Sequence, residues 1–184
     1  MLKGQDIVIL VLLRLRPRQE WTYEAISKSI RISSSQCYAA IQRLQQARLL
    51  IFSSENVLWR VPSDNFKEYV IHGLKYHFPA QIGSLVRGIP TAHSAEFVSK
   101  NFIANGVQEG DYVWPSPDGF LKGNSLQPLH PSQLHFAPKA KSFFPNLDNN
   151  DIYETFVCID LLRVGSSREQ KWAAEKLEQW NYGS

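Results

Sequence analysis

A run of seven consecutive apolar residues, Ile7 to Leu13, limits what this chain can fold into. Successive residues of a helix are turned by about 100°, so seven of them cover every face and must be buried on more than one side. The run alone does not separate a strand from a helix, but its Leu-rich surroundings, from Gln5 to Leu15 and ending before Pro17, favour a helix. A small domain rarely surrounds its first helix, so we expect a second copy of the chain to cover part of it.

The same run is far shorter than the roughly 20 residues that cross a bilayer. Arg14, Arg16 and Arg18 follow it without a small-residue cleavage site, so we expect neither a signal peptide nor a membrane span. The two cysteines, Cys37 and Cys158, fall in predicted helices, where a lone cysteine is usually a small buried apolar residue. Without a disulfide framework, the chain is expected in the cytoplasm.

Two further helices and a hairpin are predicted after this segment. Thr22 suits the N-cap of a short helix that ends at Ile30, and Ser33 or Ser34 can cap a second helix that continues to about Arg48. The second helix has one apolar stripe, formed by Cys37, Ala40, Ile41 and Leu44. The β-favouring runs "LLIF" and "VLWRV" then flank the turn "SSEN". The order helix, helix, helix, hairpin is typical of a winged helix-turn-helix.

The rest of the chain changes character twice. A helix is predicted from Ser63 to Tyr76, and eight of the ten prolines follow between Pro79 and Pro145, where helical periodicity disappears. There "SPDG" predicts a turn between two short apolar runs, which supports a hairpin. Asp151 to Val164 and the segment after Ser166 are again helical, joined at Gly165, with a capping box from Ser166 to Glu169.

We therefore predict an α+β protein, with a Pro-rich mixed region of short strands between an N-terminal winged helix-turn-helix and a C-terminal helical hairpin. Its predicted parts are a DNA-binding domain over 1–62, a connecting helix over 63–78, and a mixed domain over 79–184 for dimerisation or partner binding.

Charge is unevenly divided along the chain. Residues 1–62 carry nine Lys and Arg against four Asp and Glu, whereas residues 63–184 carry eleven against thirteen. No acidic residue occurs from Ile30 to Ser54. A basic first third indicates an anionic partner, although a weakly basic solvated surface gives the same count. The acid-free segment makes DNA the better interpretation.

The residues expected to contact DNA follow from how a helix-turn-helix docks, with its second helix in the major groove. Gln can pair with adenine, Arg with guanine, and Ser with several partners. The predicted reading residues are Ser34, Ser35, Gln36, Tyr38, Gln42 and Arg43. Phosphate contacts are predicted for Thr22, Tyr23, Lys28, Arg31 and Arg60, and wing contacts near the minor groove for Ser53, Ser54 and Asn56.

A family resemblance supports this interpretation. The segment "WTYEAISKSIRISSSQCYAAIQRLQQARLLI" and the wing "FSSENVLWRV" resemble the winged helix-turn-helix domain of bacterial transcriptional regulators of the MarR kind and of some antitoxins. Separately, "FPAQIGSLVRGIPTAHS", "VWPSPDGFLKGNSLQPLHPS" and "IDLLRVGSSREQKWAAEKL" resemble the C-terminal part of poorly characterised bacterial helix-turn-helix proteins. The resemblance implies a regulator-like architecture. Taking all these features together, we expect a homodimeric, sequence-specific DNA-binding repressor of its own operon; the alternative is an antitoxin or adaptor that binds a protein encoded nearby.

Catalysis and metal binding are not expected. The chain has no Gly-x-Ser-x-Gly, Walker-type, Gly-x-Gly-x-x-Gly or His-Glu-x-x-His motif. The spacing of its histidines, among them His72, His77, His130 and His135, matches no strong zinc motif, so neither a metal nor another cofactor is predicted. In "RGIPTAH", Arg87 and His93 flank a segment that could bind a small anion, but a structural role is favoured.

Overall fold

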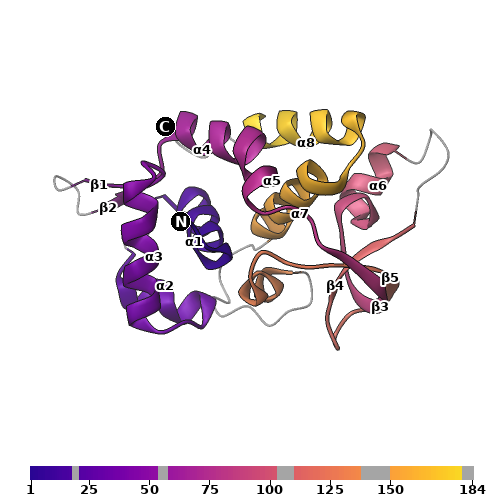
Figure 1. Cartoon of the computed structure of the whole chain (residues 1–184), viewed down its shortest axis with the longest axis horizontal. Helices are drawn as coiled ribbons and strands as arrows, with labels where there is room; N and C mark the ends of the chain where they lie inside the picture. Colours follow the sequence, from indigo (N-terminus) through magenta and orange to yellow (C-terminus); the bar gives the residue numbers. More distant parts are fainter. Residues whose placement is uncertain (18–20, 54–57, 103–109, 138–149, 180–184) are drawn as a thin grey trace.

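The structure, a computed structural model, describes residues 1–17, 21–53, 58–102, 110–137 and 150–179. Its elements lie along one long axis (Figure 1). At one end are α1 (Gly4–Leu15), α2 (Tyr23–Ile30), α3 (Ser34–Gln46) and the strands β1 (Ile51–Ser53) and β2 (Leu58–Arg60). A small barrel of three strands occupies the other end, and the two C-terminal helices lie between them. The molecule is thus a mixed α+β structure.

The N-terminal helices and the strand pair follow the predicted order. Thr22 caps α2, with its Oγ1 accepting from the Ala25 N–H at 3.1 Å. The chain then turns at Arg31, in the left-handed region with φ 54°, and Ser33 caps α3. The predicted stripe of α3 is buried throughout, and β1 pairs antiparallel with β2. These predicted helices and this strand pair are therefore confirmed.

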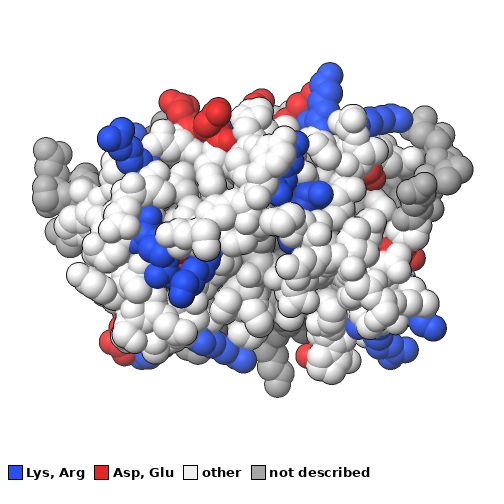
Figure 2. All heavy atoms as spheres, in the orientation of Figure 1, with Lys and Arg blue, Asp and Glu red and all other residues white. Residues whose placement is uncertain are grey.

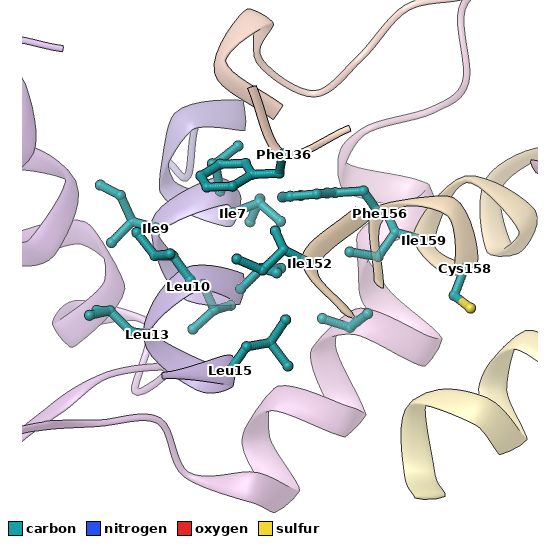
Figure 3. Packing of buried hydrophobic residues seen from close by; sticks show 14 of the residues in the cluster. Ile7, Ile9, Leu10, Leu13, Leu15, Phe136, Ile152, Phe156, Cys158 and Ile159 are labelled. Carbon is teal, nitrogen blue, oxygen red and sulfur yellow. The ribbon is translucent and has the colours of Figure 1, made fainter. Parts of the chain in front are cut away.

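Helix α1 is buried on every side by its own chain. Residues Ile7 to Leu13 are all at most 2% exposed. Figure 3 shows Phe136 and the α7 residues Ile152 and Phe156 packed beside α1, while α2 and α3 contact its other faces. Our argument for a dimer from the burial of this helix was wrong, because α7 (Asn150–Val164) supplies the expected cover.

The connecting helix is present but irregular. Its three parts are α4 (Ser63–Lys67), a π-helical stretch η1 (Glu68–Gly73) and α5 (Leu74–His77). Phe66, Val70 and Leu74 are buried. A side chain at position 73 would approach the Tyr69 ring at 3.3 Å, so glycine suits the wide turn there.

The Pro-rich region folds into short strands and short helices. Strand β3 (Ile82–Thr91) pairs antiparallel with β4 (Tyr112–Pro115) and with β5 (Leu121–Leu126). The predicted "SPDG" turn is confirmed, since the Gly119 N–H donates to the Ser116 oxygen at 3.1 Å. The predicted hairpin is wrong, because β4 and β5 pair in parallel. The segment that follows the turn contacts β3, where the Phe120 N–H donates to the Gly88 oxygen at 3.1 Å. The shorter elements are η2 (Ala92–Ser94), α6 (Glu96–Phe102) and η4 (Pro131–Phe136).

The C-terminal helical pair is confirmed. Helix α7 packs against α8 (Ser167–Gln179), and the Ser166 N–H donates to Glu169 Oε2 at 2.7 Å in the predicted cap. Helix α7 contacts α1, α5, α8, η2 and η4, so nearly all its residues from Ile152 to Leu162 are buried. None of the helices in the described ranges is long and apolar enough to cross a membrane.

Candidate nucleic-acid interface

The outer side of α3 faces away from the rest of the molecule. Figure 1 shows α3 and the β1–β2 pair at the end opposite the barrel. By helical spacing, the side opposite the buried stripe carries Ser35, Ala39, Gln42 and Gln46. Ser35 and Gln46 are exposed, and Ala39 and Gln42 are half-buried. The outer side is therefore polar and uncharged, with one methyl group at its centre.

Arg43, which we predicted to read bases, does not lie on this outer side. Its Nε and Nη2 donate to the two carboxylate oxygens of Asp6 at 2.7 and 2.8 Å. The Asp6 side chain is fully buried and that of Arg43 is 19% exposed. The hydrogen bonds to Asp6 raise the pKa of Arg43. The guanidinium thus ties α3 to the first turn of α1, and Asp6 also accepts from the Lys3 N–H at 2.8 Å.

Gln36 is exposed, but its amide oxygen is already in use. It accepts from the Ser33 N–H at 3.0 Å, and the Gln36 N–H donates to Ser33 Oγ at 3.2 Å. This reciprocal pair is a capping box. Ser35 is also engaged, with its Oγ 3.0 Å from that of Ser33. We predicted Gln36 and Ser35 as base-reading residues and overlooked their hydrogen bonds in the cap. Ser34 is exposed, as expected.

The predicted phosphate contacts on α2 are at the surface. Thr22 is exposed, with its hydroxyl oxygen capping α2, and Arg31 is exposed at the turn between α2 and α3. Lys28 is also exposed, but it forms an i,i+4 ion pair with Glu24 at 2.5 Å, which lowers the pKa of Glu24. A phosphate at Lys28 must therefore compete with this carboxylate.

A group of aromatic rings next to α3 was not foreseen. Tyr38 is 55% exposed, and its ring centroid lies 5.7 Å from that of Tyr23. Tyr23 lies 6.0 Å from Trp59, which lies 4.9 Å from Phe52, its partner across the β1–β2 pair. Tyr23 is half-buried by this packing. Tyr23 and Tyr38, which we predicted as DNA contacts, belong to one aromatic row that joins α2 and α3 to the strands.

Two of the residues predicted to contact DNA, Ser53 and Arg60, lie on the β1–β2 pair. Arg60 is exposed on β2, opposite Ile51. Ser53 ends β1, whereas Ser54 and Asn56 lie outside the described residues.

Positive side chains lie at this end of the molecule as well as at the barrel end. On the face in Figure 2, Lys and Arg spheres cluster over the part occupied by α1, α2 and α3 in Figure 1. Exposed cations of this end are Lys3, Lys28, Arg31, Arg48 and Arg60. Arg31 precedes α3 and Arg48 follows it, so cations flank both ends of the uncharged outer side.

The remaining candidates do not converge on a site. Arg87 is exposed on β3, whereas His93 is 7% exposed and donates from Nε2 to the Gly110 oxygen at 2.7 Å. The "RGIPTAH" segment is therefore a strand leading into η2, and it does not bring the two side chains together. Within the described ranges no group of three or more His, Cys, Asp or Glu is placed to hold a metal ion.

A buried polar network was also missed. Asp160 of α7 is fully buried and accepts from Thr91 Oγ1 at 2.7 Å, Trp114 Nε1 at 2.6 Å and Arg163 Nη1 at 2.7 Å. Burial raises the pKa of Asp160, and these three donors oppose that shift. All three contacts are made inside the chain, so the network anchors the barrel to α7. The spacing of Asp160 and Arg163, i and i+3 on one helix, was the available signal.

No protein-family model, curated protein or solved structure matches the chain.

Proposed function

We propose that the chain is a sequence-specific double-stranded DNA-binding protein that regulates transcription. One observation carries the proposal: α3 lies at an end of the molecule with an uncharged polar outer side, flanked by exposed Arg31 and Arg48. An α-helix fits the major groove of B-DNA, where polar side chains meet base edges and cations meet phosphates. In this proposal α1–α3 and β1–β2 form a winged helix-turn-helix, with α3 as its recognition helix.

The rest of the proposal concerns the regulator as a whole. A homodimer would place two copies of α3 on half-sites about 34 Å apart, one turn of the duplex. As a cytoplasmic repressor of its own operon, it would bind upstream of its gene. The barrel and the helical pair, which share one hydrophobic core with α1, would provide dimer or partner contacts.

Titration of the chain against a fluorescent duplex of its own upstream DNA tests the function. Affinity should exceed that for a scrambled duplex and fall steeply between about 50 and 200 mM salt, because bound cations release counterions from the phosphates. Arg31→Ala should weaken binding to both duplexes about equally. Lys171→Ala, which removes an exposed cation on α8, is the matched control and should leave both affinities unchanged. Absence of binding at low salt would overturn the proposal.

A second candidate is a protein-interaction module, such as an antitoxin, that uses the barrel end. Ile82, Leu85 and Phe120 are 54%, 56% and 59% exposed there. Arg87 lies directly opposite Lys122 in the β3–β5 register, and like charges in this position repel. Exposed apolar side chains beside two cations suit an acidic protein partner.

Co-expression with the product of the neighbouring gene, followed by size-exclusion chromatography, separates the two candidates. The second candidate requires a stoichiometric complex that survives Gln42→Ala and is lost with Leu85→Asp. A complex that Leu85→Asp leaves intact would place the partner elsewhere and refute this use of the barrel.

A further inference from the structure

We infer that α3 reads A·T base pairs through the major groove, an inference that rests on the proposed function. The first step concerns guanine. Arg43 is the only Lys or Arg in α3, and the bidentate contact of Arg or Lys with guanine O6 and N7 is the commonest specific contact to this base. Arg43 already uses Nε and Nη2 on Asp6. Reading guanine with this fork would leave a fully buried carboxylate without its cation, which costs more than one base contact returns.

The side-chain amides of α3 remain as groups that can read a base. Gln42 and Gln46 lie one turn apart on the outer side of α3, and their side-chain amides make no hydrogen bond with any residue in the described ranges. An amide offers one acceptor and one donor, which match N6 and N7 of adenine. Gln36 has the same chemistry, but its oxygen is held by the cap. Gln42, near the middle of the helix, is therefore the principal reader.

The third step concerns the other base of the pair. Ala39 lies one turn before Gln42 on the same side of α3. Its methyl group can contact the C5-methyl group of thymine, which only A·T pairs present in the major groove. Because Ala39 has no polar side-chain atom, its side chain cannot form a hydrogen bond with guanine or cytosine.

The cations around α3 supply affinity without sequence preference. Arg31 lies before the helix and Arg48 after it, beyond Ala47 at its C-terminal end. At these two positions they suit the phosphates that border the groove. The uncharged centre of α3 therefore provides the sequence specificity, and Arg31 and Arg48 at its two ends provide the salt-dependent part of the affinity.

Selection of duplexes from a random pool by the full chain tests the inference. The selected sites should have A·T pairs at the centre of each half-site. In competition titrations, Gln42→Ala should reduce the preference for the selected site over a G·C-substituted site by about tenfold, within the range for one bidentate contact. Gln45→Ala, on the flank of α3, is the matched control and should leave the preference unchanged.

Base analogues separate major-groove reading from recognition of a narrow minor groove. Replacing the central thymines by uracil should weaken wild-type binding about fourfold, as expected for one buried methyl group, and should leave Ala39→Gly unaffected. Replacing the central adenines by 7-deazaadenine removes N7 and should lower the affinity of the wild type but not of Gln42→Ala.

Two outcomes distinguish failure of the inference from failure of the proposed function. Selected sites rich in G·C, or an A·T preference that survives both analogues, would overturn the inference and leave DNA binding in place. If no duplex is enriched and none binds at low salt, the proposed function itself fails and the inference fails with it.

Discussion

The ion pair between Asp6 and Arg43 makes a sharp prediction, because a cation on a recognition helix is usually taken for a base contact. Arg43→Met removes the charge and keeps most of the apolar stem. It leaves Asp6, fully buried, with the Lys3 N–H as its remaining donor among the contacts described above. Breaking a buried pair from one side costs about 3–5 kcal/mol of the free energy of unfolding.

The opposite change should cost less. Asp6→Asn keeps the shape of the side chain and leaves the Arg43 guanidinium, which is 19% exposed, within reach of water. We expect a loss of about 1–3 kcal/mol. In Asp6→Asn combined with Arg43→Met, both charges are removed together, and the double variant should be at least as stable as Arg43→Met alone.

Urea unfolding of the four proteins, followed by circular dichroism, gives the coupling energy directly. At a temperature where each variant is folded, the double variant should keep the sequence preference of the wild type for DNA. The reasoning is refuted if Arg43→Met changes the free energy of unfolding by less than about 0.5 kcal/mol and abolishes the preference. That result would make Arg43 a reader.

Three further predictions concern stability. Ser33→Ala should cost about 1 kcal/mol in urea unfolding, because it removes the hydroxyl that caps α3; no loss would show that the cap contributes nothing. Asp160→Ala should lower the free energy of unfolding by about 3–5 kcal/mol, because it leaves the buried Arg163 without its carboxylate partner. Asp118→Ala in the exposed turn should change it by less than about 0.5 kcal/mol, and equal effects of the two variants would contradict this reasoning. Burial lowers the pKa of His130, so below about pH 6.5 the unfolded chain binds more protons and the melting temperature should fall with pH. His130→Asn keeps a capping side chain for η4 without titrating, so an unchanged pH profile would contradict the assignment.

Local patterns predicted local structure well. The stripe from Cys37 to Leu44, the cap at Thr22 and the Ser166–Glu169 box are set by neighbours three or four residues away, and all three are present. The capping role of Gln36 was also visible in the spacing Ser-x-x-Gln from Ser33, but we assigned that residue to base reading.

Long-range contacts could not be predicted in the same way. Helical spacing places Arg43 beside Gln42, but its position is decided by Asp6, 37 residues earlier. A lone carboxylate at the start of an apolar helix was a signal that a cation had to be near, without identifying which one. Likewise, α1 was expected to need a second copy, since nothing in the local pattern shows that α7 returns to cover it.

Strand β3 was missed for a related reason. Gly83, Gly88 and Pro90 are residues that usually interrupt strands. In the barrel, a side chain at position 88 would meet the Trp114 oxygen at 2.2 Å, so glycine permits the close approach of β3 and β4. The glycine at position 88 thus indicates that another segment approaches closely, but it does not identify β4 as that segment.

The most direct test of the account is a two-dimensional amide NMR titration of the full chain with its selected duplex. The account predicts that the largest shifts fall on α3, the Arg31 turn and the β1–β2 pair, and that β3–β5 at the far end change little. Largest shifts on the barrel, with α3 unperturbed, would contradict it and place the DNA, or any other partner, at the opposite end of the molecule.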